Sequence, residues 1–181
     1  MKKIFVISIM TLVFASSFYT NAEAVTNGNG TANINVTAPS TNALYMTAYP
    51  SFDFGTAKNT VQQVVASGDQ PYTIVDLRGG SSGFQIQAKI SDFTIANNSA
   101  KKLPVIDFIL SVADSTDGSV QGSSQINIFN QNGTVIRAGA DTNGLNVSGG
   151  ANATLNLLNK TGLSTGVQYN AIITHSLVAG I

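Results

Sequence analysis

Alternating apolar and polar residues run through most of the chain and predict β-strands. The strongest pattern combines a short apolar run at residues 72–77 with a strict alternation at residues 84–90, as a half-buried strand requires. The connection between the two is rich in glycine and serine, so we predict a β-hairpin. Asp76 and Arg78 flank its turn, where an exposed ion pair would contribute less than about 1 kcal/mol.

Similar patterns predict further strands before and after this hairpin. Pro50 ends the first of them because proline has no N–H to donate to a strand ladder. Asn132-Gly133 is a strong turn signal and predicts a second hairpin. Polar residues 94–102 and 114–124 predict loops. The other predicted strands lie at residues 44–48, 60–66, 125–129, 134–138, 145–147, 153–158 and, as one long closing strand, 167–178.

One segment, residues 103–113, is apolar almost throughout and predicts a strand buried on both faces. Pro104 sets the earliest start of this strand. Asp107 interrupts the apolar run, so it either points to a rim or is buried and hydrogen-bonded, and we favour the rim. Near residue 50, Phe52 and Phe54 share one face of an extended segment, which predicts two core rings followed by a turn at Gly55.

These patterns amount to about ten strands with no amphipathic helix, which predicts an all-β fold, a single antiparallel β-sandwich or barrel-like domain. The N-terminus carries two lysines, an apolar run and Ala22-Glu23-Ala24, the three parts of a secretory signal peptide. We therefore expect residues 1–24 to be removed, residues 25–40 to form a flexible leader, and residues 41–181 to form the domain. The apolar run is too short for a confident membrane span, so we expect no membrane attachment after cleavage.

The composition narrows the possible functions. Removing Lys2, Lys3 and Glu23 from the nine basic and nine acidic residues leaves seven and eight, so the exported chain is almost neutral. This balance argues against nucleic acid as a partner, because nucleic-acid binding depends on clustered lysine and arginine. The absence of cysteine excludes a disulfide framework, so stability has to come from packing.

Catalytic chemistry has little support in the sequence. With one histidine and no cysteine, the chain lacks the residues for a Cys–His pair or a histidine-rich metal site, and it contains no recognised hydrolase motif. Asp114 and Asp117 lie in a loop that lacks the twelfth-position acid of a calcium loop. We expect no enzyme activity, no catalytic residue, no cofactor and no metal, and a hydrolase of wall polymers is the weakest of the hypotheses.

Several segments together resemble the WxL domain, a cell-wall-binding domain of Gram-positive surface proteins. The resemblance covers residues 41–181 and rests on the order of its elements. Phe84 and His175 stand where that family has tryptophans, and this chain has no tryptophan. The matching segments are Phe52-Asp53-Phe54-Gly55, the Asp76-Leu77-Arg78-Gly79 element, Gly83-Phe84-Gln85-Ile86 with Phe93, and Tyr169 followed by His175-Ser176-Leu177.

The resemblance implies a secreted, non-catalytic protein attached non-covalently to peptidoglycan at the cell surface, beside co-encoded surface proteins. It implies ligand contacts at Phe84, Ile86, His175 and Leu177. Structural roles fall on the motif positions Phe52, Asp53, Phe54, Gly55, Asp76, Arg78, Gly79 and Tyr169.

Two of these residues also have a purely structural interpretation, and the protein has an alternative function. Alternation with Ile86 makes Phe84 a core candidate, and His175 could be a strand residue satisfied by a hydrogen bond. The alternative function is a structural or adhesive subunit that binds another surface protein or host matrix through an exposed strand edge.

Overall fold

The computed structural model describes residue 34 and residues 43–58, 61–79, 82–140, 142–158 and 164–180. The chain divides into two parts, residues 1–36 and 37–181, and every described strand belongs to the second part. The predicted signal peptide and, apart from Ile34, the predicted leader lie outside the described residues.

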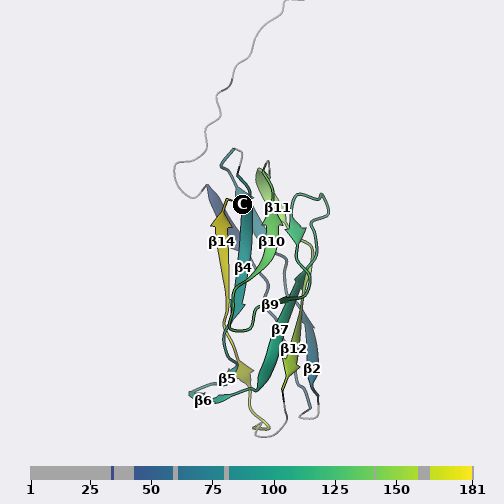
Figure 1. The fold of residues 1–181 in the computed structure, drawn as a ribbon, viewed down its shortest axis with the longest axis vertical. Coiled ribbons are helices and arrows are strands. Elements are labelled where there is room, and N and C mark those ends of the chain that lie inside the picture. The colour runs from purple at the N-terminus through teal and green to yellow at the C-terminus, as the bar shows by residue number, and fades with distance from the viewer. Residues whose placement is uncertain are drawn as a thin grey trace, which may run out of the picture. The chain divides into compact units, whose positions relative to one another are not determined.

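Residues 37–181 form an all-β unit, as the alternation predicts. The described residues contain 14 strands and no helix, and every strand pair is antiparallel, in a sandwich-like arrangement without a closed barrel (Figure 1). The first sheet has the order β1 (Leu44–Ala48), β3 (Thr73–Asp76), β11 (Gly144–Val147). The second has the order β14 (Ile173–Ala179), β4 (Phe84–Ile90), β10 (Gly133–Ala138), β8 (Gln121–Gly122).

Two further sheets complete the unit. The third has the order β2 (Gln63–Ser67), β12 (Ala151–Leu157), β7 (Val105–Val112), β9 (Ile126–Asn127). The fourth is small, with the order β13 (Tyr169–Asn170), β5 (Thr94–Ile95), β6 (Asn98–Lys102). Figure 1 shows β14, β4 and β10 side by side, and β7, β12 and β2 side by side.

The first three sheets share one hydrophobic core, and Phe108 on β7 is the centre of its aromatic part. Phe52 and Phe54 both meet the Phe108 ring edge-on, with ring centroids 6.1 and 5.7 Å away, and Phe93 stacks on it at 6.1 Å. The prediction that Phe52 and Phe54 are core rings is therefore confirmed. Gly55, which follows them, has a φ of 60°, the left-handed turn that glycine tolerates.

The hairpin predicted for residues 72–90 is wrong. Residues 73–76 pair with β1 and β11, whereas residues 84–90 pair with β10 and β14, so the two strands belong to different sheets. Ile74 and Phe84 are both fully buried, which means that each strand contributes one face to the common core from its own sheet. Alternation identified both strands but carries no information on which strands they pair with.

The second predicted hairpin is wrong as well. β9 pairs with β7, and β10 pairs with β4 and β8. The tight hairpin turn needs positive φ at both central residues, and neither Asn132 nor Gly133 has it. Gly133 serves close packing instead, because a Cβ there would lie 2.3 Å from Cγ2 of Ile126 and 2.9 Å from Cγ2 of Ile128.

Two other segments differ from their predictions. Residues 94–102 contain the β5–β6 hairpin rather than a loop, and its turn uses Asn97 at a φ of 62°, a value that asparagine tolerates better than most residues. The closing strand is interrupted at Ala171 and Ile172, so that β13 pairs with β5 and β14 pairs with β4.

β7 is buried on one face only, contrary to the prediction for residues 103–113. Phe108 and Leu110 point into the core, while Asp107 lies half-buried on the outer face of the sheet. Asp107 is therefore neither at a rim nor in the core. Its Oδ1 accepts a hydrogen bond of 2.6 Å from Nδ2 of Asn156 on the neighbouring strand, which compensates the partial loss of water.

Candidate binding face

The two segments that resemble the WxL motifs lie on neighbouring strands. β4 and β14 pair over seven residues, with Ile86 opposite Leu177 and Phe84 opposite Ala179 (Figure 1). His175 lies opposite Ala88 in the same ladder. The fold therefore brings all four predicted ligand positions onto one strand pair, although the two segments are about ninety residues apart in the sequence.

The side chains at these positions point toward the core. Phe84 and Ile86 have 0% exposed surface, and Leu177 packs against the core as a partly buried residue. The alternative that Phe84 is a core residue is confirmed. A fully buried ring does not reach a sugar in this conformation, so the predicted ligand contacts of Phe84 and Ile86 are not available here.

His175 lies in an aromatic pocket of its own. Its Nδ1 is 2.9 Å from the Tyr72 hydroxyl, and the Tyr49 ring lies against it with centroids 5.0 Å apart. The Pro50 carbonyl, which can only accept a hydrogen bond, lies near the imidazole and favours its protonated form. We assign the Nε2–H tautomer, in which Nδ1 accepts from Tyr72. His175 is thus the hydrogen-bonded strand residue of the alternative interpretation.

Burial controls the protonation of this cluster. It lowers the pKa of His175 from 6.5 to about 4, against the weaker effect of the Pro50 hydrogen bond, and it raises the pKa of Tyr72 above its usual value. His175 is therefore neutral near pH 7. In this state it accepts the Tyr72 hydrogen bond and carries no charge with which to attract an anion.

Asp76 and Arg78 form the predicted ion pair, and it is more buried than the sequence analysis assumed. The two side chains are 2.7 Å apart, and that of Asp76 is only 3% exposed. The Arg78 guanidinium also donates to the carbonyls of Ser82 and Gly83, so it ties the end of β3 to the start of β4. Its hydrogen bond lowers the pKa of Asp76 despite burial, and the pKa of Arg78 is raised in turn.

The remaining motif residues have local structural roles. Gly79 has a φ of 68°, as the turn after Arg78 requires. Oδ1 of Asp53 accepts a hydrogen bond of 2.8 Å from the Gly55 N–H, and the Tyr169 hydroxyl accepts one of 3.1 Å from the Ser164 N–H.

The opposite side of β4 and β14 faces solvent. Side chains alternate along a strand, so the residues between the motif positions point outward. One row across the sheet contains Val178, Gln85, Arg137 and Gln121, and the next contains Ser176, Gln87 and Thr134. We call this surface the glutamine face; it consists of Gln85, Gln87, Lys89, Gln121, Thr134, Arg137, Thr174, Ser176 and Val178.

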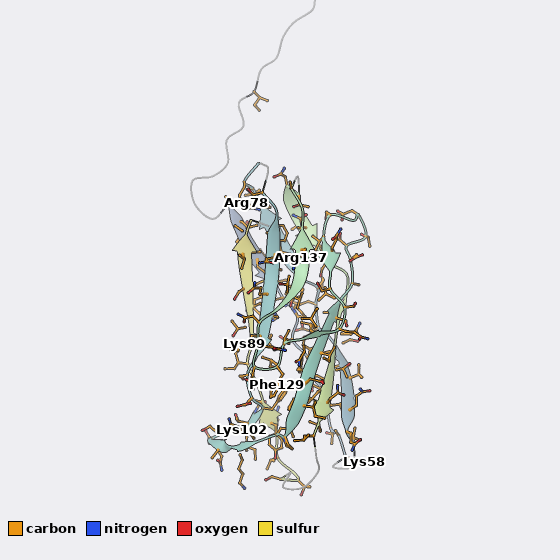
Figure 2. All side chains as sticks on the ribbon, in the orientation of Figure 1. Lys58, Arg78, Lys89, Lys102, Phe129 and Arg137 are labelled. Atoms are coloured by element: carbon orange, nitrogen blue, oxygen red, sulfur yellow. The ribbon has the colours of Figure 1, made fainter. Side chains whose placement is uncertain are left out.

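The glutamine face combines three carboxamides, three hydroxyls and two cations, and none of its nine residues is acidic. Figure 2 shows Lys89 over β4 and Arg137 over β10. Within the described part of the chain, no side-chain hydrogen bond or ion pair involves any of the nine residues. None of the nine residues was predicted as a site residue, and the polar half of the alternation at residues 84–90 is the sequence signal that points to Gln85, Gln87 and Lys89.

The outer face of the β2–β12–β7 sheet provides a contrast. There Gln63 donates to Asn156 at 2.9 Å, Asn156 donates to Asp107 at 2.6 Å, and Ser67 donates to Asn152 at 2.9 Å. The polar groups of that face satisfy one another. Those of the glutamine face have donors and acceptors left for water or for a ligand.

A second outward surface has a different character. On the β1–β3–β11 sheet, Tyr45, Val75 and Leu145 form one row across the three strands, with Leu77 and Val147 beside it. Four of these five side chains count among the exposed large hydrophobic residues, and none of the five is charged. We call these five residues the apolar face.

The aspartates of the loop before β8 accept hydrogen bonds from the loop itself and from β8. Asp114 accepts a hydrogen bond from the Gly122 N–H, and Asp117 accepts from the N–H and hydroxyl of Ser119, which lowers the pKa of Asp117 to about 2. Across the described residues, no three His, Cys, Asp or Glu side chains are placed to hold a metal ion. The same residues include no helix long and apolar enough to cross a membrane.

Comparison with known proteins does not assign a family: no family model matches the sequence, and no curated protein matches it. Inferences about function therefore rest on the residues of this chain. Within the described residues, the glutamine face carries polar side chains that make no hydrogen bond to another side chain, and the apolar face carries exposed hydrophobic side chains.

Proposed function

We propose that this chain is a secreted, non-catalytic surface protein that attaches non-covalently to the peptidoglycan of the Gram-positive cell wall. The observation that carries the proposal is the pairing of β4 with β14, which brings the two WxL-like segments together. On its outer side this pairing carries the half-buried Gln85 and Gln87 and the exposed Ser176. The attachment surface is therefore the glutamine face, on the reverse of the strands that carry Phe84 and His175.

The chemistry of the glutamine face suits a glycan. A carboxamide both donates and accepts hydrogen bonds, as a sugar hydroxyl does, so each can satisfy the other. Neighbouring strands lie about 4.8 Å apart and residues rise by about 3.4 Å, so the residues from Gln85 to Lys89 span about 13 Å along the sheet. A flat surface of that size matches an extended polymer better than a small enclosed substrate.

Sedimentation with purified Gram-positive walls tests this proposal. We expect the purified protein to pellet with the walls, and the double variant Gln85→Ala/Gln87→Ala to bind at least about tenfold more weakly, since two pairs of hydrogen bonds are lost. Gln168→Ala is the matched control, because Gln168 is an exposed glutamine outside the face. Wild-type protein that stays in the supernatant, or a double variant that pellets normally, would contradict the proposal.

The apolar face favours a second candidate function, a structural or adhesive subunit that binds another surface protein or host matrix. An uncharged row such as Tyr45, Val75 and Leu145 offers little to a glycan but suits the apolar surface of a protein. Cross-linking on intact cells tests this function, with Leu145→Asp expected to remove the cross-linked partner and to leave wall sedimentation unchanged. Val65→Asp is the control, because Val65 and Leu145 are similarly exposed, at 63% and 66%.

A further inference from the structure

We propose that the glutamine face recognises an anionic wall polymer, with Arg137 and Lys89 neutralising two of its charged groups; this inference rests on the proposed attachment to the wall. The groups recognised are phosphate or carboxylate anions carried on a hydroxyl-rich chain. The proposal adds a ligand class to the face, and it makes charge as well as hydrogen bonding part of the attachment.

Arg137 is the first observation. It lies between Gln85 on β4 and Gln121 on β8 in one cross-strand row, so that its two neighbours across the sheet both carry carboxamides. Arg78, which has a structural role, forms an ion pair with Asp76 and donates hydrogen bonds to two carbonyls. Arg137 has no ion pair with any described residue. Its planar fork of donors is therefore free for the two oxygens of a carboxylate or phosphate.

Lys89 is the second observation. It points outward on β4, four residues beyond Gln85, and no described acid pairs with it. Lys102, on the small fourth sheet, is by contrast held 2.5 Å from Asp92. A rise of about 3.4 Å per residue and one strand spacing of about 4.8 Å put Lys89 and Arg137 about 14 Å apart. Gln85, Gln87 and Thr134 occupy the space between these two cations.

A recess beside Arg137 is the third observation. It is open to solvent and has a volume of about 460 Å³, and Arg137, Ser119, Gln121 and Thr142 contribute to its walls. Because the recess is open to solvent, it would surround a ligand only in part. One charged unit of a polymer, such as a phosphate with its polyol or a carboxylated sugar, would fit beside the guanidinium.

The nearest described acids lie in the loop before β8. Asp114 and Asp117 are engaged by the Gly122 N–H and by Ser119, respectively, and neither forms an ion pair with Arg137. The spacing of the two cations decides the ligand class. A small anion would meet Arg137 or Lys89 but not both, whereas a linear polymer with repeated charges reaches both and places its hydroxyls over the glutamines.

The test measures binding of the protein to intact walls, to walls stripped of phosphodiester polymers with hydrofluoric acid, and to soluble polyphosphate and polygalacturonate. Each cation contact with a flexible polyanion lowers the logarithm of the association constant by about 0.7 for a tenfold rise in salt concentration. Two contacts therefore predict a slope of about −1.4 for log K against log salt. Arg137→Gln/Lys89→Gln should weaken binding at least about tenfold at low salt and remove most of the slope. Lys58→Gln/Lys101→Gln removes the same charge away from the face and should change neither.

The outcomes separate the two proposals. The inference is overturned if wall binding does not depend on salt concentration and is unchanged in the Arg137→Gln/Lys89→Gln variant. The proposed function then still stands. Failure to pellet with walls, together with Arg137-dependent binding of either soluble polymer, overturns the proposed function and supports the anion site. Binding to neither walls nor polymers overturns both. Loss of binding to stripped walls identifies phosphate as the anion and overturns peptidoglycan itself as the ligand of the proposed function. Retention with competition by polygalacturonate identifies carboxylate and leaves peptidoglycan attachment standing.

Discussion

The Tyr72 hydroxyl lies 2.9 Å from Nδ1 of His175, and this contact connects two sheets. Tyr72 immediately precedes β3 of the β1–β3–β11 sheet, and His175 lies on β14 of the β14–β4–β10–β8 sheet. The two rings also meet edge-on, with centroids 5.3 Å apart. The backbone of Pro50, which follows β1, also lies near the imidazole and opposes the lowering of its pKa.

The link should make the fold sensitive to acid. The pKa of His175 is about 4 in the folded protein against 6.5 for a free histidine, so the unfolded chain binds a proton first as the pH falls. Stability is therefore full above pH 6.5 and decreases between pH 6.5 and 4. The expected loss is about 1 to 3 kcal/mol, because the ring keeps some exposure that screens the effect. Urea unfolding at a series of pH values measures it.

Two variants isolate the histidine in that measurement. His175→Gln cannot titrate, so its free energy of unfolding should be lower than wild type at pH 7 but flat between pH 6.5 and 5, above the range in which carboxylates with lowered pKa values such as Asp117 contribute. Tyr72→Phe keeps the ring and removes the hydroxyl, so it should cost about 1 kcal/mol at pH 7 and keep the pH dependence. An unchanged slope in His175→Gln would show that another group titrates.

The Asp76–Arg78 pair should stabilise the protein more than the Asp92–Lys102 pair. The side chain of Asp76 is 3% exposed, whereas those of Asp92 and Lys102 are 32% and 57% exposed. Asp76→Asn leaves the guanidinium without its carboxylate and should cost about 2 to 4 kcal/mol, while Asp92→Asn should cost less than about 1 kcal/mol. Thermal unfolding at pH 7 compares the two, and equal losses would contradict the difference in burial.

Neighbouring residues on β4 should respond in opposite ways. Phe84→Ala empties a fully buried site and should cost about 3 to 5 kcal/mol of stability, with wall binding retained by the molecules that remain folded. Gln85→Ala should leave stability within about 0.5 kcal/mol and reduce wall binding. Calorimetry and sedimentation on the same samples check both. If Phe84→Ala abolished binding without loss of stability, the aromatic position itself would be the contact.

Two glycines allow a test of the β8 region. A Cβ at Gly122 would lie 2.0 Å from the Val112 carbonyl oxygen, whereas one at Gly139 would meet nothing within 4 Å. Gly122→Ala should therefore cost about 2 kcal/mol or more and loosen the loop beside Arg137. Gly139→Ala should be neutral or slightly stabilising, because it restricts the unfolded chain. Chemical denaturation separates them, and similar midpoints would contradict the close approach at Gly122.

The alternation of apolar and polar residues predicted the positions of most strands, but it did not predict which strands pair with one another. The alternation at residues 84–90 and at residues 173–179 reflects burial of one face, which is a local property of each strand. Pairing depends on contacts between distant segments. The turn signals predicted two hairpins that the fold does not contain. At Asn132-Gly133 the chain uses the small size of glycine for packing against Ile126 and leaves its freedom at positive φ unused.

The same difference between local pattern and long-range pairing applies to the candidate site. The resemblance singled out the segments around Phe84 and His175, and the fold brings their strands together as neighbours. It also emphasised the aromatic positions, which alternation directs into the core. Arg137 could not have been connected with Gln85 from the sequence, because only the β4–β10 register brings them side by side.

The register of β4 against β14 has a practical consequence. No short peptide cut from this chain contains the glutamine face, since its residues come from four separate stretches that become neighbours only in the folded sheet. Antibodies raised against linear fragments should therefore leave attachment unblocked. Transfer of the proposed attachment surface to another scaffold would require the whole four-stranded sheet.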